Sequence, residues 1–117
     1  MEMSIRGRQL DLTDLFKNYV QRRLGFAMSK FDSRIRGVEV VVCDVNGPRG
    51  GVDKACAITA TVRPIGRVFA RAVAIDSYAA VDSAVSRLRT VLVRRLQHRR
   101  EPRRRDTRAV LRMKYAA

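Results

Sequence analysis

Residues 55–72 read ACAITATVRPIGRVFARA, and this stretch decides the fold. On both sides of segment 64–66, apolar side chains occupy every second position, which is typical of strands with one buried face. The inward-facing residues are Cys56, Ile58, Ala60, Val62, Val68, Ala70 and Ala72. Because proline and glycine in segment 64–66 favour a tight turn, the stretch predicts two neighbouring strands joined by a short connection.

Two further strands are expected before this pair. Residues 38–43 (VEVVVC) are rich in valine, whose branched side chain favours strands. Residues 3–8 alternate more weakly, and Gly7 permits a bulge or a close approach of the backbone. The shared faces hold Met3 and Ile5 in one strand and Val38, Val40 and Val42 in the other.

Residues 12–31 are predicted to form an amphipathic helix, because apolar residues recur there at spacings of three and four. Asp11 is the expected N-cap, and Leu10 and Leu15 then occupy the positions of a hydrophobic staple. The apolar stripe is Leu12, Leu15, Phe16, Tyr19, Val20, Leu24, Ala27 and Phe31.

A second helix is predicted from Asp76 or Ser77 to residues 101–102, where Glu-Pro disfavours its continuation. We expect Asp76 and Asp82 to cap this helix or complement its dipole. The apolar stripe is Tyr78, Val81, Ala84, Val85, Leu88, Val91, Leu92 and Leu96.

The predicted order is therefore β-α-β-β-β-α, an α+β fold. Since each helix and each strand has one apolar face, the economical packing is a four-stranded, mostly antiparallel sheet with both helices on one side. The other side of the sheet is then open to solvent. It carries Arg6, Thr59, Thr61, Arg63, Phe69 and Arg71.

The charge of the chain points to a polyanionic partner. Its 117 residues carry a formal net charge of +14, with 46% hydrophobic residues, enough to build one core. Residues 87–117 contain 12 Lys and Arg against 2 acidic residues and so contribute +10. Nucleic acid is the first candidate partner, and an anionic membrane surface is the second. Because the second helix needs its apolar face for the core, the membrane alternative is weaker.

Little in the sequence supports catalysis, a metal or a cofactor. Cys43 and Cys56 are too few for a disulfide framework or a typical zinc site, and strand parity makes them face apart. His98 is the only histidine. Segment 46–51 (NGPRGG) predicts a hairpin loop, since it lacks the Gly-Lys-Ser/Thr ending of a phosphate loop. With no apolar leader or spanning segment, we expect a non-enzymatic cytoplasmic protein without a small-molecule substrate.

Three motifs resemble a known family. Residues 5–13 (IRGRQLDLT) are similar to the pattern I-x-G-R-x-L-x-[VLI]-T, and residues 76–82 (DSYAAVD) to D-x-Y-A-A-I-D. The strand ending Val68-x-Ala70-x-Ala72 also fits. Over residues 3–100 the chain thus resembles the ribosome hibernation promoting factor / ribosome-associated inhibitor A family, in its short, sigma-54 modulation protein-like form.

The resemblance implies a fold similar to double-stranded-RNA-binding domains and a specific partner. Family members bind the small ribosomal subunit in the channel of messenger and transfer RNA and silence idle ribosomes under stress. We therefore expect a hibernation-factor-like domain over residues 1–100 and a basic tail over residues 101–117, in a protein that is monomeric when free. The alternative is a general structured-RNA-binding module without ribosome specificity.

The candidate RNA contacts are basic residues that fall away from the apolar stripes, where Arg and Lys would meet phosphates. In the two helices they are Arg22, Arg23, Lys30, Arg87, Arg89, Arg94, Arg95, Arg99 and Arg100. In the tail they are Arg103, Arg104, Arg105 and Arg108. An ordinary solvated face is the competing interpretation. Base stacking on the open sheet is less favoured, because Phe69 is a single aromatic residue there.

Overall fold

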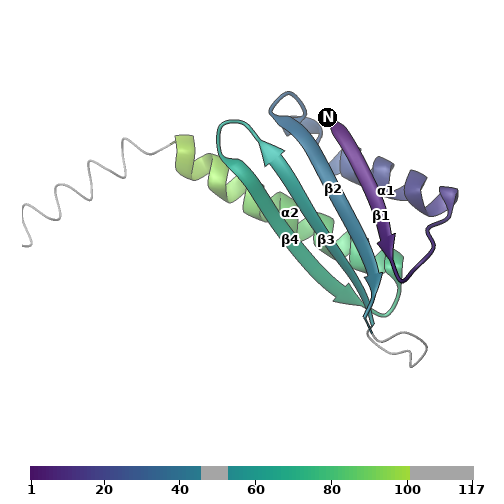
Figure 1. Cartoon of the computed structure of the whole chain (residues 1–117). Coiled ribbons are helices and arrows are strands. Elements are labelled where there is room, and N and C mark those ends of the chain that lie inside the picture. Colours follow the sequence, from purple (N-terminus) through teal and green to yellow (C-terminus); the bar gives the residue numbers. More distant parts are fainter. Residues whose placement is uncertain (46–52, 101–117) are drawn as a thin grey trace, which may run out of the picture.

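The computed structural model describes residues 1–45 and 53–100, and its elements follow the predicted β-α-β-β-β-α order (Figure 1). The elements are β1 (Glu2–Arg8), α1 (Asp14–Ala27), a short 3-10 turn η1 (Ser29–Phe31), β2 (Ile35–Asp44), β3 (Lys54–Val62), β4 (Gly66–Ala74) and α2 (Ser77–Arg100). The predicted hairpin loop 46–51, the helix end at 101–102 and the basic tail lie outside the described residues.

The four strands form one mixed sheet in the order β1-β2-β3-β4. β1 runs parallel to β2, whereas β3 is antiparallel to both β2 and β4. In the register, Val40 lies between Ile5 and Ile58, and Ile58 pairs with Ala70. The β3–β4 connection ends at Gly66, whose φ of +87° suits glycine because other side chains rarely adopt it. The mostly antiparallel sheet is therefore confirmed.

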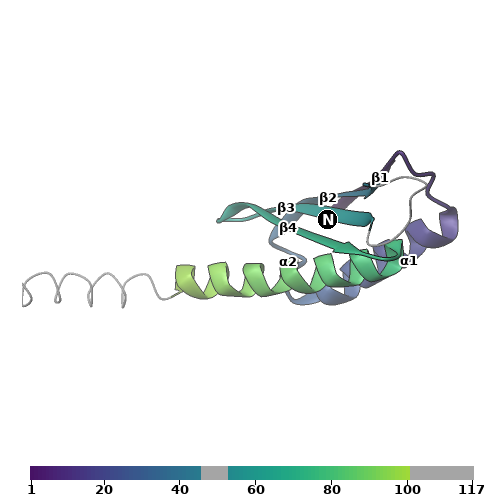
Figure 2. The ribbon, with the colours of Figure 1, turned by 90° about the horizontal axis from the view of Figure 1, so that it is seen from below.

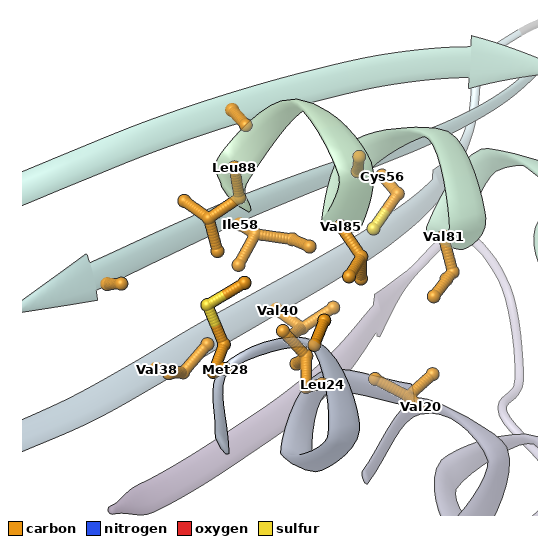
Figure 3. Close-up of a cluster of buried hydrophobic side chains, with 14 of the residues drawn as sticks. Val20, Leu24, Met28, Val38, Val40, Cys56, Ile58, Val81, Val85 and Leu88 are labelled. Carbon is orange, nitrogen blue, oxygen red and sulfur yellow. The ribbon is translucent and has the colours of Figure 1, made fainter. Parts of the chain in front are cut away.

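Both helices cover the same face of the sheet (Figure 2). The predicted inward-facing residues of β2, β3 and β4 are buried, and Leu24 of α1 and Leu88 of α2 are fully buried against them. Figure 3 shows Val40 and Ile58 of the sheet meeting Leu24 of α1 and Leu88 of α2 between the strands and the two helices. Burying a Leu, Ile or Val side chain contributes about 1.5–3 kcal/mol, so this layer is the main source of stability.

The start of α1 differs from the prediction. Thr13, not Asp11, is the N-cap: its extended backbone precedes the helix, and its hydroxyl accepts from the Phe16 N–H at 3.1 Å. Leu15 is 70% exposed, so the predicted staple between Leu10 and Leu15 does not form. The helix ends at Ala27, and Phe31 reaches the core from the 3-10 turn instead.

The cause of this shift is the connection between β1 and α1. Gln9 has a φ of +56°, and the chain folds back so closely that a Cβ on Gly7 would lie 2.1 Å from the Leu10 carbonyl oxygen. The close approach anticipated at Gly7 is therefore confirmed. Because this turn takes up residues 9–12, the helix begins two residues later than its apolar pattern suggests.

Candidate nucleic-acid interface

The two helices are joined to each other through Asp82 of α2. The Tyr19 hydroxyl donates to Asp82 Oδ1 at 2.5 Å, and Nε of Arg23 donates to the same oxygen at 3.2 Å. The hydrogen bond to this carboxylate raises the pKa of Tyr19, because it stabilises the protonated phenol. Asp82 therefore bridges the helices rather than serving the helix dipole, whereas Asp76 caps α2 as predicted by accepting from the Ala79 N–H at 2.8 Å.

Aromatic rings reinforce this junction. The ring of Tyr78 lies edge-on to Phe16 and Tyr19, with centroid distances of 5.0 and 4.9 Å. Tyr78 packs as its position in the stripe predicts, yet it keeps 41% of its surface exposed. The junction fixes the spacing between α1 and α2, and with it the shape of the surface between them.

That surface is hollowed along the helices. A hollow of about 360 Å³ and another of about 630 Å³ share Lys30 and Arg89 in their linings. Arg23 and Phe26 belong to the first hollow and Arg34 to the second. We call the two together the interhelical groove. Among the described residues, four basic side chains and no acidic one line it.

A second basic surface follows the outer side of α2. Arg94 lines a shallow hollow of about 470 Å³ there, together with Arg89, Thr90 and Gln97. Arg22 is exposed on α1. The predicted contacts Arg22, Lys30, Arg89 and Arg94 are thus all exposed on the helical side of the molecule.

Two predicted contacts lie toward the edge of the sheet instead. Arg87 Nη1 donates to the carbonyl oxygen of Arg71 at 2.7 Å, and Arg95 Nη1 donates to that of Arg67 at 3.2 Å. Both acceptors belong to β4, the edge strand beside α2. These two arginines therefore tie α2 to the sheet and satisfy carbonyl groups that an edge strand leaves unpaired.

The remaining predicted contacts are not described. The side chains of Arg99 and Arg100, and the tail residues Arg103, Arg104, Arg105 and Arg108, lie outside the described part of the chain. Sequence reasoning also missed Phe26 and Arg34, which line the interhelical groove. A signal existed for Phe26: it is an aromatic residue that falls off the apolar stripe of α1.

The open face of the sheet carries the expected polar residues. Arg6 forms an ion pair with Glu39, and Phe69, which pairs with Thr59 in the register, is 57% exposed. This face therefore mixes basic, acidic and hydroxyl side chains, in contrast to the groove.

The two cysteines behave as strand parity predicts. Cys56 lies on the inner face under α2, and Cys43 on the other face of the neighbouring strand; both are free thiols. Burial raises the pKa of Cys56 from 9.0 to about 12. In residues 1–45 and 53–100, no three His, Cys, Asp or Glu side chains gather as metal ligands. Neither helix, as far as it is described, is long and apolar enough to span a membrane.

Comparison with known proteins agrees with this fold. The family model described as sigma 54 modulation protein / S30EA ribosomal protein matches residues 3–100. A search of the curated proteins finds no match. The N-terminal domain of Thermus thermophilus Protein Y superposes with a TM-score of 0.64 at 28% identity, over 77% of this chain and 93% of that domain. A ribosomal subunit interface protein from Coxiella burnetii gives a TM-score of 0.69 at 17% identity, over 83% of this chain and 99% of that one, and so shares the fold.

Proposed function

Because the chain belongs to the sigma 54 modulation protein / S30EA ribosomal protein family, we propose that it binds the ribosome and inhibits translation. The domain over residues 1–100 docks on small-subunit ribosomal RNA in the channel of messenger and transfer RNA. It promotes hibernation of idle ribosomes under stress. Occupying the channel excludes both RNAs, so the mechanism requires no chemical step, only affinity and slow release.

The observation that carries this proposal is the interhelical groove. Lys30, from the 3-10 turn after α1, and Arg89, from α2, line the same hollows and meet no acidic side chain in the described lining. Such a surface suits the phosphates of folded RNA, since releasing their counterions drives binding. Arg22 and Arg94 extend the contact on either side, and the basic segment 101–117 adds long-range attraction.

The first test is co-sedimentation of the purified protein with separated ribosomal subunits over a series of salt concentrations. We expect binding to the small subunit that weakens with salt, and competition by messenger RNA with initiator transfer RNA. If the protein sediments equally with both subunits and with unrelated RNA, the ribosome-specific proposal is wrong and the general RNA-binding module replaces it.

The second test locates the surface with two matched double variants. Lys30→Gln with Arg89→Gln removes two charges from the groove, and Arg67→Gln with Arg71→Gln removes two from the sheet side. The groove variant should lose about tenfold or more in affinity, with a salt slope shallower by about one unit per lost phosphate contact. The sheet variant should stay within about twofold of the wild type. Equal losses would mean that total charge matters, and not the groove.

A further inference from the structure

Phe26 is the most exposed large hydrophobic residue in the described part of the chain, with 83% of its surface accessible. It lies near the end of α1 and lines the smaller hollow of the interhelical groove. An aromatic ring exposed to water adds no hydrophobic stabilisation to the fold, and it leaves apolar surface exposed in the unbound protein. Its position inside a basic groove therefore suggests a ligand that covers the ring.

The side chains around Phe26 define the chemistry of that ligand. Arg23 precedes it by three residues and so lies on the same side of α1. Lys30 follows from the 3-10 turn, and Arg89 approaches from α2, in the lining of the same hollow. Ala27 and Val85 supply an apolar floor. An apolar ring surrounded by cations matches a ligand that carries a flat apolar group between negative charges.

We propose that Phe26 is a stacking platform for an unpaired RNA base. The base lies on the exposed ring, while Lys30 and Arg89 hold the phosphates beside it. Every base offers a π-face, and aromatic side chains in basic grooves bind single-stranded nucleotides in this way. The inference rests on the proposed function and narrows it: the RNA in the groove includes a nucleotide outside the duplex.

A protein segment fits the same place less well. An apolar side chain of a protein partner placed on Phe26 would lie among Arg23, Lys30 and Arg89. Of these three, only Arg23 has an acidic partner among the described residues, Asp82, so the partner would also have to supply anions to the other two.

The other exposed phenylalanine, Phe69, is flanked on its own strand by Arg67 and Arg71. Across the sheet it pairs with Thr59, and Glu39 follows on the next strand of the same face. Phe69 is therefore an exposed ring with basic neighbours on an open sheet face that also carries Glu39, and it provides a control for exposure and nearby charge outside the groove.

Tryptophan fluorescence tests the stacking directly, because the chain contains no tryptophan. Phe26→Trp and Phe69→Trp each place one fluorophore at an exposed aromatic position. They are titrated with an RNA hairpin that has an unpaired loop, and with a fully paired duplex carrying the same number of phosphates. We expect quenching of Phe26→Trp by the hairpin, little by the duplex, and none of Phe69→Trp by either RNA. Quenching at position 69 alone would move the site to the sheet face.

Affinity supplies the second measurement. Phe26→Leu should weaken hairpin binding about tenfold, whereas Phe26→Tyr, which keeps the ring, should bind like the wild type. The salt slope should not change, since no phosphate contact is lost. Equal binding by Phe26→Leu and the wild type overturns the inference, as does a loss that Phe69→Leu reproduces.

The same variants separate this inference from the proposed function. If subunit binding depends on Lys30 and Arg89 but Phe26→Leu sediments unchanged, the proposed function stands and the stacking platform fails. If the wild type ignores the small subunit while the hairpin still quenches Phe26→Trp, stacking stands and the ribosomal partner is wrong.

Discussion

The two faces of the sheet use their charged residues in different ways. On the open face, Arg6 is paired with Glu39, and at one end of the sheet Lys54 lies 3.3 Å from Asp44 and 3.2 Å from Asp53. On the helical face, the groove is lined by basic side chains, of which Arg23 is matched by Asp82. The net charge of +14 therefore does not show how basic and acidic side chains are distributed between the two faces. In the described residues, the lining of the interhelical groove contains basic side chains and no acidic one, which is why we propose the site for RNA there.

The largest difference between the two faces should appear in the rates at which their thiols are alkylated. Cys43 and Cys56 sit on adjacent strands but face opposite ways. Raising the pKa of Cys56 from 9.0 to about 12 lowers its thiolate fraction near neutral pH about a thousandfold. Alkylation followed by mass spectrometry should therefore label Cys43 at least about a hundredfold faster than Cys56. Both should react in denaturant. Similar rates in the native protein would show that the inner face opens readily.

The same thiol sets a dependence of stability on pH. The folded pKa of Cys56 is raised, so the unfolded chain loses its proton first. The stabilising contribution is complete below about pH 9 and is lost as the pH rises toward 12, by up to about 1.4 kcal/mol per unit. Cys56→Ala should flatten this part of the curve in denaturant titrations. An unchanged slope would assign the loss to other groups.

Gly7→Ala should give the next largest effect, a loss of stability, because Gly7 allows the tight turn that places α1 on the helical face of the sheet. A Cβ there would lie 2.1 Å from the Leu10 carbonyl oxygen, so the backbone must move. We expect a loss of at least about 2 kcal/mol in the free energy of unfolding. Gly25→Ala is the control: a Cβ at this helical position meets nothing within 4 Å. It should be neutral or stabilise by about 0.5–1 kcal/mol.

These glycines mark what the sequence could and could not predict about the fold. Alternation assigned the buried faces of β2, β3 and β4, because each strand has one face against the helices. The start of α1 was misplaced, since Asp11 and Thr13 are both good N-caps. The choice between them depends on the fold-back at Gln9 and Gly7, a close backbone contact that leaves no periodic pattern.

The candidate site shows a similar division. The sequence could select the basic residues that avoid the apolar stripes. It could not distinguish the two sides of α2, because the position of β4 beside the helix determines which arginines meet carbonyl groups. The hydrogen bond between Tyr19 and Asp82 joins residues 63 positions apart, so no local sequence pattern predicts it either. Phe26 could have been selected from the sequence, because it is an aromatic residue that falls off the apolar stripe of α1.

Asp82→Ala should separate stability from binding on the helical face. It removes the acceptor of both Tyr19 and Arg23, which should cost about 1–2 kcal/mol. The pKa of Tyr19 should fall back toward 10.0, as followed by ultraviolet titration. RNA affinity should hold or rise a few-fold, because Arg23 is released into the groove. Asp82→Asn keeps an acceptor for Tyr19 and should cost less. Weaker RNA binding at unchanged stability would instead make Asp82 part of the binding surface.

The smallest effects should distinguish Arg87 from Arg94, which the sequence places two helical turns apart on one side of α2. Arg87→Gln loses the hydrogen bond to the Arg71 carbonyl, so it should lower stability by about 0.5–1 kcal/mol and leave the salt slope of RNA binding unchanged. Arg94→Gln should do the reverse: stability within about 0.5 kcal/mol of the wild type, but a salt slope shallower by about one unit. Thermal melts and binding titrations on the same samples check both. If Arg87→Gln flattens the salt slope as much as Arg94→Gln does, RNA also contacts the protein at the edge of β4, and the binding surface extends past α2 to the sheet.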